Sequence, residues 1–241
     1  MIVPNHVAIL GLGPSLSQYM SLVRGLGGRS AFCDEVWAIN GLGDVFQCDR
    51  IFHMDDVRIQ EIRASAAPDS NIANMLKWMK GHPGPIMTSR AHPDYPGLVE
   101  FPLEAVINKL GFAYFNNTAA YALAYAIFIG VKKVSLWGCD YTYPNAHDAE
   151  KGRACLEYWL GFAKHAGIEI STGNTSSLMD ACVPWDERLY GYDTLKVSVA
   201  KREGADDYAV TFTERETLPT AAEIEDRYDH SVHPNRLVEA A

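Results

Sequence analysis

A loop of small residues near the N-terminus is the first place where this sequence could do chemistry. Residues 8–17 read AILGLGPSLS, so an apolar run ends in Gly11-Leu12-Gly13-Pro14-Ser15. Glycine lets a backbone approach a ligand closely, and proline fits the first turn of a helix. Because free amides at a helix start attract anions, Gly11, Gly13 and Ser15 are expected to bind phosphate. A tight structural turn is the alternative, since the loop lacks the third glycine of the dinucleotide fingerprint and the lysine of a P-loop.

Polar residues also follow five later segments. In parallel sheets the C-terminal strand ends border the crevice in which ligands bind. We therefore expect these side chains to converge on one pocket together with the first loop. The residues are Asn40, the pair Asp55 and Asp56, Ser89, the pair Asn117 and Thr118, and the pair Asp140 and Tyr141.

The carboxylates in this set have two interpretations each. Asp55 and Asp56 could hold Mg²⁺ against a diphosphate, because carboxylate oxygens suit that ion. An N-cap of a helix is the alternative for this pair. Asp140 follows an apolar run, and a carboxylate at a buried edge must be paired, hydrogen-bonded or protonated. It could hold a ribose hydroxyl or a metal, or it could close a loop.

His147 is a candidate general base, since an imidazole with an ordinary pKa can take a proton from an acceptor hydroxyl. A surface histidine is the alternative. Arg153 and Glu157 are four residues apart on an expected helix, which favours an ion pair between them over a phosphate contact.

The elements that must position these residues alternate along the chain. Short apolar runs predict strands, and apolar residues at helical spacing predict helices between them. The pattern predicts an α/β fold, a Rossmann-like three-layer sandwich with a mostly parallel sheet of about five to seven strands. Thr118 and Asp148 are the expected caps of the last two helices, and residues 91–115 are expected to form a long connection. Strands are expected at 7–10, 35–40, 49–54, 85–89, 132–137 and 168–171, and helices after Pro14 and at 60–80, 103–110, 119–129 and 149–166.

The character of the chain changes near residue 190. Residues 194–200 and 208–213 alternate like a hairpin, and a short helix and a polar tail follow. We expect a nucleotide-binding domain over 1–190 and a C-terminal extension over 191–241.

Composition argues against several classes of protein. The chain has 241 residues, 48% of them hydrophobic, and a formal net charge of −9. The acidic balance argues against a nucleic-acid partner held by a broad basic face. The longest apolar stretch, around 119–130, is too short to span a bilayer, and the N-terminus lacks signal-peptide character, so a cytoplasmic protein is expected.

Three motifs carry a family resemblance over residues 7–190. GLGPSL, AIN at 38–40, and the stretch from NNT at 116–118 to GCDY at 138–141 resemble the superfamily of bacterial sialyltransferases that use CMP-sialic acid (glycosyltransferase family 42-like). The same superfamily includes archaeal 6-hydroxymethylpterin diphosphokinase and uncharacterised phage proteins. Leu12 stands where the sialyltransferases have an asparagine that holds cytidine, which argues against CMP-sialic acid in particular.

The resemblance implies a nucleotide or nucleotide-sugar donor as the bound cofactor. By likeness, Asn40 would contact the nucleotide, Asn117 and Thr118 would approach the donor's phosphate and sugar, and Gly138 and Tyr141 would belong to the strand end beside it. The family's histidine base lies further along the chain than His147 does here, so the two do not align.

The function expected from the sequence is therefore a glycosyltransferase acting on a nucleotide-activated donor and an acceptor alcohol. Asp140, His147 and Asp56 are its candidate catalytic residues, and Asp55 with Asp56 the candidate Mg²⁺ ligands. Two alternatives stay open: a Mg²⁺-dependent diphosphokinase acting on a pterin-like alcohol, and a non-catalytic nucleotide-binding protein. A homo-oligomer is compatible with each.

Overall fold

The structure is a computed structural model that describes residues 2–142, 145–205 and 207–226. The chain divides into two compact units, Met1–Cys182 and Val183–Ala241. This division precedes the expected boundary at residue 190, and the nucleotide-binding role assigned to the first part stays a prediction.

The first unit is built on one parallel sheet of seven strands in the order β5-β4-β3-β2-β1-β6-β7. The chain adds β2 to β5 on one side of β1, and then β6 and β7 on the other. The sheet therefore has its topological switch point between β1 and β6, where ligands bind in open α/β folds. The strands are β1 (His6–Leu10), β2 (Glu35–Ile39), β3 (Arg50–Phe52), β4 (Ile86–Thr88), β5 (Leu98–Glu100), β6 (Lys133–Trp137) and β7 (Glu169–Thr172).

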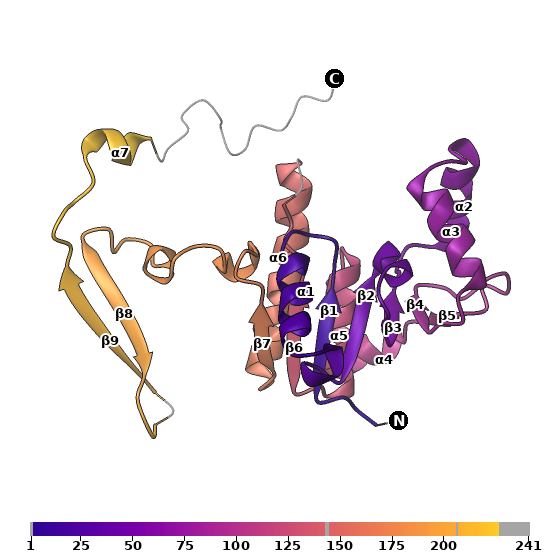
Figure 1. Cartoon of the computed structure of the whole chain (residues 1–241), viewed down its shortest axis with the longest axis horizontal. Coiled ribbons are helices and arrows are strands. Elements are labelled where there is room, and N and C mark those ends of the chain that lie inside the picture. The colour runs from indigo at the N-terminus through magenta and orange to yellow at the C-terminus, as the bar shows by residue number, and fades with distance from the viewer. Residues whose placement is uncertain (1, 143–144, 206, 227–241) are drawn as a thin grey trace. The chain divides into compact units, whose positions relative to one another are not determined.

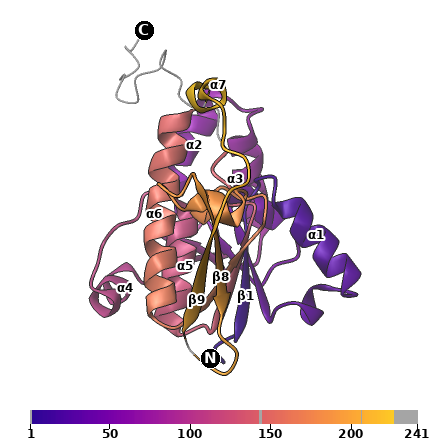
Figure 2. The same cartoon turned by 90° about the vertical axis from the view of Figure 1, so that its left-hand side faces the viewer.

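Helices cover both faces of this sheet, which confirms the expected three-layer α/β sandwich (Figures 1 and 2). One apolar core lies under α4, α5 and α6, and a second lies under α1, α2 and α3. The helices are α1 (Leu16–Gly25), α2 (Val57–Ala66), α3 (Asn71–Gly81), α4 (Leu103–Leu110), α5 (Thr118–Ile129) and α6 (Ala146–His165), with short 3₁₀ turns at η1 (Arg29–Ala31), η2 (Asn40–Asp44) and η3 (Leu178–Asp180).

The starts of α5 and α6 differ from expectation. Asn117, not Thr118, is the N-cap of α5, and its side chain accepts from the backbone N–H of Ala120. Asn145, not Asp148, is the N-cap of α6. In both cases an asparagine just before the expected cap has extended backbone geometry and reaches the free amides first.

The expected long connection over 91–115 contains an additional strand, β5. Its three residues include one buried apolar side chain, Leu98, and two exposed ones, so no periodic signal marks it. Within the residues that the structure describes, no helix combines the length and apolarity needed to cross a membrane.

The second unit contains the expected hairpin. Strands β8 (Leu195–Lys201) and β9 (Tyr208–Glu214) pair antiparallel, with η4 (Trp185–Arg188) before them and α7 (Ala221–Glu225) after them. The expected C-terminal tail lies outside the described residues.

Candidate functional site

The backbone of the β1–α1 loop packs closely against the end of β6 and is hydrogen-bonded to it. The backbone N–H of Gly11 donates to the carbonyl of Trp137 at 2.8 Å, and that of Gly13 donates to the carbonyl of Gly138 at 2.7 Å. A Cβ atom on Gly11 would lie 2.4 Å from the Gly138 oxygen, and one on Gly138, whose φ is +71°, would lie 2.0 Å from the Gly11 oxygen. These glycines are therefore needed so that two backbones can approach each other.

Ser15 and Asp140 form the centre of this contact, which we call the Ser15–Asp140 clamp. The backbone N–H and the hydroxyl of Ser15 each donate to one Asp140 carboxylate oxygen, both at 2.6 Å. The Ser15 Oγ also accepts from the backbone N–H of Gly138 at 2.7 Å. Asp140 is only 2% exposed and Ser15 is fully buried. The anion at the start of α1 is thus the protein's own carboxylate, placed where the helix dipole favours negative charge.

The clamp changes how the first loop can bind a donor. The amides of Gly11, Gly13 and Ser15 all have partners inside the protein, so a phosphate needs other donors. Leu12, 72% exposed, lies at the tip of the loop beside the exposed Pro14, and no hydrogen bond joins its amide to another described residue. Asp140 closes the loop, as its alternative interpretation proposed, and a part for it in catalysis stays a prediction.

Asn40 lies at the next strand end, held by a histidine. It follows β2 with a φ of +52°, and its Oδ1 is 3.1 Å from Nδ1 of His53, which follows β3. The β2–β3 register, with Ile39 beside Phe52, brings the two residues together. A non-glycine residue at positive φ is uncommon and is found often at functional sites.

The ring of His53 is buried, with 1% exposure, and burial favours its neutral form. Burial lowers the pKa of His53 from its ordinary 6.5, and the carboxylate of Asp55, 4.0 Å from Nδ1, opposes this only in part. Both neighbouring oxygens lie on the Nδ1 side, so the proton belongs there. His53 then donates to Asn40 Oδ1, which leaves the Asn40 amide nitrogen as a donor for other groups.

Two buried polar atoms on this part of the sheet edge have no partner in the described part of the chain. They are Nε2 of His53 and Oγ1 of Thr88. Phe52 pairs with Met87, so His53 and Thr88 are the next residues along neighbouring strands. The sequence analysis did not single out His53; its position directly after a buried strand, level with Asn40, was the signal that could have identified it.

A third group joins the NNT and GCDY motifs. The Tyr141 hydroxyl donates to Oδ1 of Asn117 at 2.9 Å, and the Asn117 amide donates to the carbonyl of Gly152 in α6 at 3.1 Å. Tyr141 has a φ of +49°, and a Cβ on Gly152 would lie 2.5 Å from its ring. Thr118, the first residue of α5, is partly buried beside this group. The aromatic ring of Tyr141 is therefore fixed between two helices.

The predicted acid–base and metal residues are not gathered in this way. Asp56 is the N-cap of α2 and accepts from the backbone N–H of Arg58, while the Asp55 side chain is about half exposed. His147 is an exposed residue in the first turn of α6. Among the residues described, no group of three or more histidine, cysteine, aspartate or glutamate side chains could hold a metal ion.

The expected ion pair between Arg153 and Glu157 is confirmed, with an Nε–Oε1 distance of 2.9 Å. Asp180 joins it, at 3.0 Å from Arg153 Nη2. This ion pair fixes the segment that follows β7, and Ser177 in the same segment donates its hydroxyl to the carbonyl of Asp140. The loop after β7 is thus attached to the clamp.

Comparison with known proteins gives structural likeness only. No family model matches the sequence, and no curated protein matches it. Two similar solved structures are those of the sialyltransferase CstII from Campylobacter jejuni, one with cytidine-5'-monophosphate and one with CMP-3FNeuAc. They are 17% and 18% identical to this chain, cover 72% of it and 82% and 83% of their own chains, and have TM-scores of 0.39 and 0.44.

The fold class rests on the sheet order and helix layers of this chain. Neither the pterin enzyme nor a phage protein is among the structures described above, so that part of the resemblance stays a prediction.

Proposed function

We propose that this chain is a glycosyltransferase that takes a sugar from a nucleotide-activated donor and passes it to an acceptor alcohol. One observation carries the proposal. The sequence motifs GLGPS and NNT, which are far apart in the chain, are each hydrogen-bonded to GCDY at the topological switch point. Asp140 binds Ser15 on one side, and the adjacent Tyr141 binds Asn117 on the other. Such a switch point is the usual nucleotide position in open α/β sheets.

The groups left for the donor are mostly neutral. The Leu12 amide and the Asn40 amide nitrogen can each donate to an oxygen of the phosphate, ribose or base. Asn117, Thr118 and Tyr141 would line the donor site on the α5 side. Gly11, Gly13, Ser15 and Gly138 would act through the shape that they give the loop.

Mg²⁺ could reach the donor phosphates through the half-exposed carboxylate of Asp55, whereas Asp56 is engaged as a helix cap. A diphosphokinase would require the ion, since Mg²⁺ neutralises the charge that develops on a transferred phosphoryl group. The metal dependence of binding and turnover therefore separates this alternative from glycosyl transfer.

The test is a thermal-shift panel of CMP, UDP, GDP and ATP compounds with and without Mg²⁺. A ligand that binds only the folded state raises the melting temperature by mass action. We expect a shift with at least one nucleotide and a smaller shift in Asn40→Asp, which replaces the free amide donor by an oxygen. Asn108→Asp, an exposed asparagine on α4, is the matched control. If no nucleotide moves the melting temperature, the proposal is wrong.

A nucleotide-binding protein without turnover is the second candidate, because a specific observation favours it. The Asp140 carboxylate accepts from both the amide and the hydroxyl of Ser15 and is buried, and His147 is exposed on α6. Incubation of the protein with a nucleotide sugar that shifts its melting temperature, followed by chromatography of the nucleotide products, separates the two. Intact donor after long incubation with a panel of acceptor alcohols would favour binding alone.

A further inference from the structure

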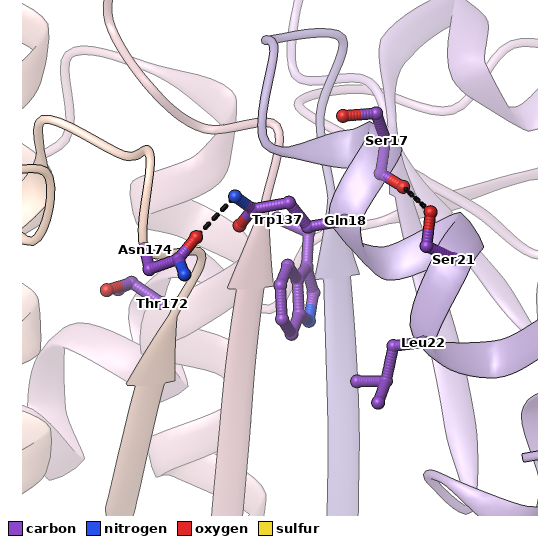
Figure 3. A pocket seen from close by; sticks show the side chains of 7 residues that line it. All are labelled: Ser17, Gln18, Ser21, Leu22, Trp137, Thr172 and Asn174. Atoms are coloured by element: carbon purple, nitrogen blue, oxygen red, sulfur yellow. Dashed lines mark hydrogen bonds between the residues drawn. The ribbon is translucent and has the colours of Figure 1, made fainter. Parts of the chain in front are cut away.

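A pocket of mixed polar and apolar lining lies beside the clamp, between α1 and the ends of β6 and β7 (Figure 3). Its volume is about 460 Å³, within the range of small-molecule sites. Gly173 separates it from the clamp: a Cβ there would lie 2.6 Å from the Cβ of Ser15. We call it the α1–β7 pocket. It involves none of the residues to which the proposed function assigns donor binding.

Two amide side chains meet across this pocket. Gln18 reaches from α1 and donates its Nε2 to Oδ1 of Asn174, as Figure 3 shows. An amide pair joined by one such bond always leaves one carbonyl oxygen and one NH₂ group for a third molecule, whichever way round the amides lie. The pair therefore offers a ligand both an acceptor and a donor.

Two hydroxyl groups of α1 complement the amides. The Ser17 hydroxyl donates to the carbonyl of Pro14 at 2.9 Å, and the Ser21 hydroxyl donates to the carbonyl of Ser17 at 3.0 Å. Because each hydroxyl has one hydrogen, both oxygens accept from a ligand in this arrangement, whereas the hydroxyl of Thr172, which also lines the pocket, can donate or accept. At the two serines a phosphate or carboxylate, which offers mainly acceptors, would meet acceptors. A ligand hydroxyl would find partners for its own hydrogen.

An apolar surface completes the pocket. The indole of Trp137 and the side chain of Leu22 line it, and the indole packs against the rings of Tyr19 and Phe32. Nε1 of Trp137 is buried and has no hydrogen-bond partner among the described residues. Of the described residues that line the pocket, none is ionisable. The lining thus combines an aromatic ring, amides and hydroxyls without charge.

We propose that the α1–β7 pocket binds a neutral saccharide unit. A sugar ring has hydroxyls that both donate and accept, and C–H faces that pack on an indole. The chemistry of the pocket matches this ligand and disfavours a nucleotide phosphate, so the site is distinct from the donor site of the proposed function. It does not depend on that function, because free sugars can test it.

The experiment is a titration of ¹⁵N-labelled full-length protein with glucose, galactose, N-acetylglucosamine and a neutral disaccharide, followed by the indole N–H signals in two-dimensional NMR. The five tryptophans give separate probes, and Trp137→Phe assigns the signal of Trp137. We expect at least one sugar to shift the Trp137 signal to saturation, with a Kd of the order of 1 mM.

The variants make the result specific. Asn174→Leu keeps the side-chain shape and removes both amide groups, so we expect the affinity to fall at least about tenfold, the loss of about 1.4 kcal/mol. Asn108→Leu on α4 is the matched control and should bind like the wild type. Glucose 6-phosphate and gluconate, the anionic counterparts, should bind more weakly than glucose.

Three outcomes would overturn the proposal: no shift of Trp137 with any neutral sugar, a shift that does not saturate, or equal binding by Asn174→Leu. The nucleotide panel is read separately from melting temperatures. Failure of the proposed function would therefore leave this result unchanged, and the reverse also holds.

Discussion

Two neighbouring stretches of one sheet edge differ in how their polar groups are used. At the ends of β1 and β6, Ser15 and Asp140 are buried and fully hydrogen-bonded to each other. At the ends of β3 and β4, His53 and Thr88 are equally buried, yet each keeps one polar atom without a partner in the described chain. In the first stretch the polar groups of Ser15 and Asp140 are therefore used to hold two loops together. The second stretch retains capacity to bind, since buried polar atoms normally have partners.

Because of this difference, we expect fewer ligand contacts from the glycine loop after β1 and more from the residue that follows β2. The glycine loop looks like an anion site in sequence, but its anion is supplied by the protein itself. Asn40, between the two stretches, has both a strained backbone and an amide nitrogen left over from its bond with His53. Within the proposed function, Asn40 therefore extends the donor site from the switch point toward the β2 to β4 side, with the clamp as its rigid support.

The largest effect is expected for Gly138→Ala, which disrupts the contact between the β1–α1 loop and the end of β6. The new Cβ would lie 2.0 Å from the Gly11 carbonyl at a φ of +71°, so the two loops must separate. We expect a loss of at least about 4 kcal/mol in the free energy of unfolding, or no folded protein. Urea unfolding measures it.

The matched control for that variant is Gly167→Ala. Gly167 also has a positive φ, +81°, but a Cβ there would meet nothing within 4 Å. Its cost should be only that of the backbone conformation, about 1 kcal/mol. Equal losses in the two variants would show that the contact between the loops adds nothing.

Asp140→Asn should have the next largest effect. It keeps the shape of the side chain but removes the charge and places an NH₂ group toward the donors of Ser15. Charged hydrogen bonds contribute about 1.5–3 kcal/mol each, so we expect a loss of about 2–3 kcal/mol in denaturant unfolding. Asp44→Asn, at an exposed position in η2 with no side-chain hydrogen bond or ion pair among the described residues, should cost less than about 0.5 kcal/mol. A near-neutral Asp140→Asn would mean that the clamp is not what holds the loop.

A smaller effect, on the pH dependence of stability, is expected from His53 in the second stretch. His53 has a lowered pKa in the folded state, so below pH 6.5 the unfolded chain takes up a proton that the folded chain does not. The contribution of His53 to the free energy of unfolding is therefore fully present above pH 6.5. It is lost as the pH falls toward the pKa of His53 in the folded state, at up to about 1.4 kcal/mol per pH unit. Unfolding at about pH 7.5 and about pH 5.5 measures this, because the two values bracket the ordinary titration of histidine.

The variant for this measurement is His53→Asn, whose amide can still donate to Asn40. Its loss of stability between the two pH values should be smaller than that of the wild type. Identical losses would show that His53 is not buried as a neutral ring.

The sequence was sufficient for the fold because alternation and apolar runs report burial directly. The buried run at 7–10 and the wholly apolar helix at 119–129 appear where expected. It was insufficient for β5, which is too short to show a period, and for the helix caps, where two candidates lay within three residues.

The site was predicted as a set of residues but not as a set of partners. Spacing shows that Gly13, Ser15 and Asp140 lie near one edge, and it does not show that an amide expected to bind phosphate binds Asp140 instead. The pairing of His53 with Asn40 depends on strand register, which no local pattern in the sequence records.

The smallest effect is expected for Thr88→Val, and it tests the comparison most finely. Valine has the shape of threonine, and Oγ1 of Thr88 has no partner in the described chain, so its removal breaks no bond. We expect the variant to be between neutral and about 1 kcal/mol more stable than the wild type in urea unfolding. Ser135→Ala is the contrast, because the buried Ser135 hydroxyl bonds both His6 and Ser171 and its loss should cost about 1 kcal/mol. If Thr88→Val is instead destabilised, a bound water molecule uses that hydroxyl. If it binds a nucleotide less well than the wild type, the edge beside β4 belongs to the donor site.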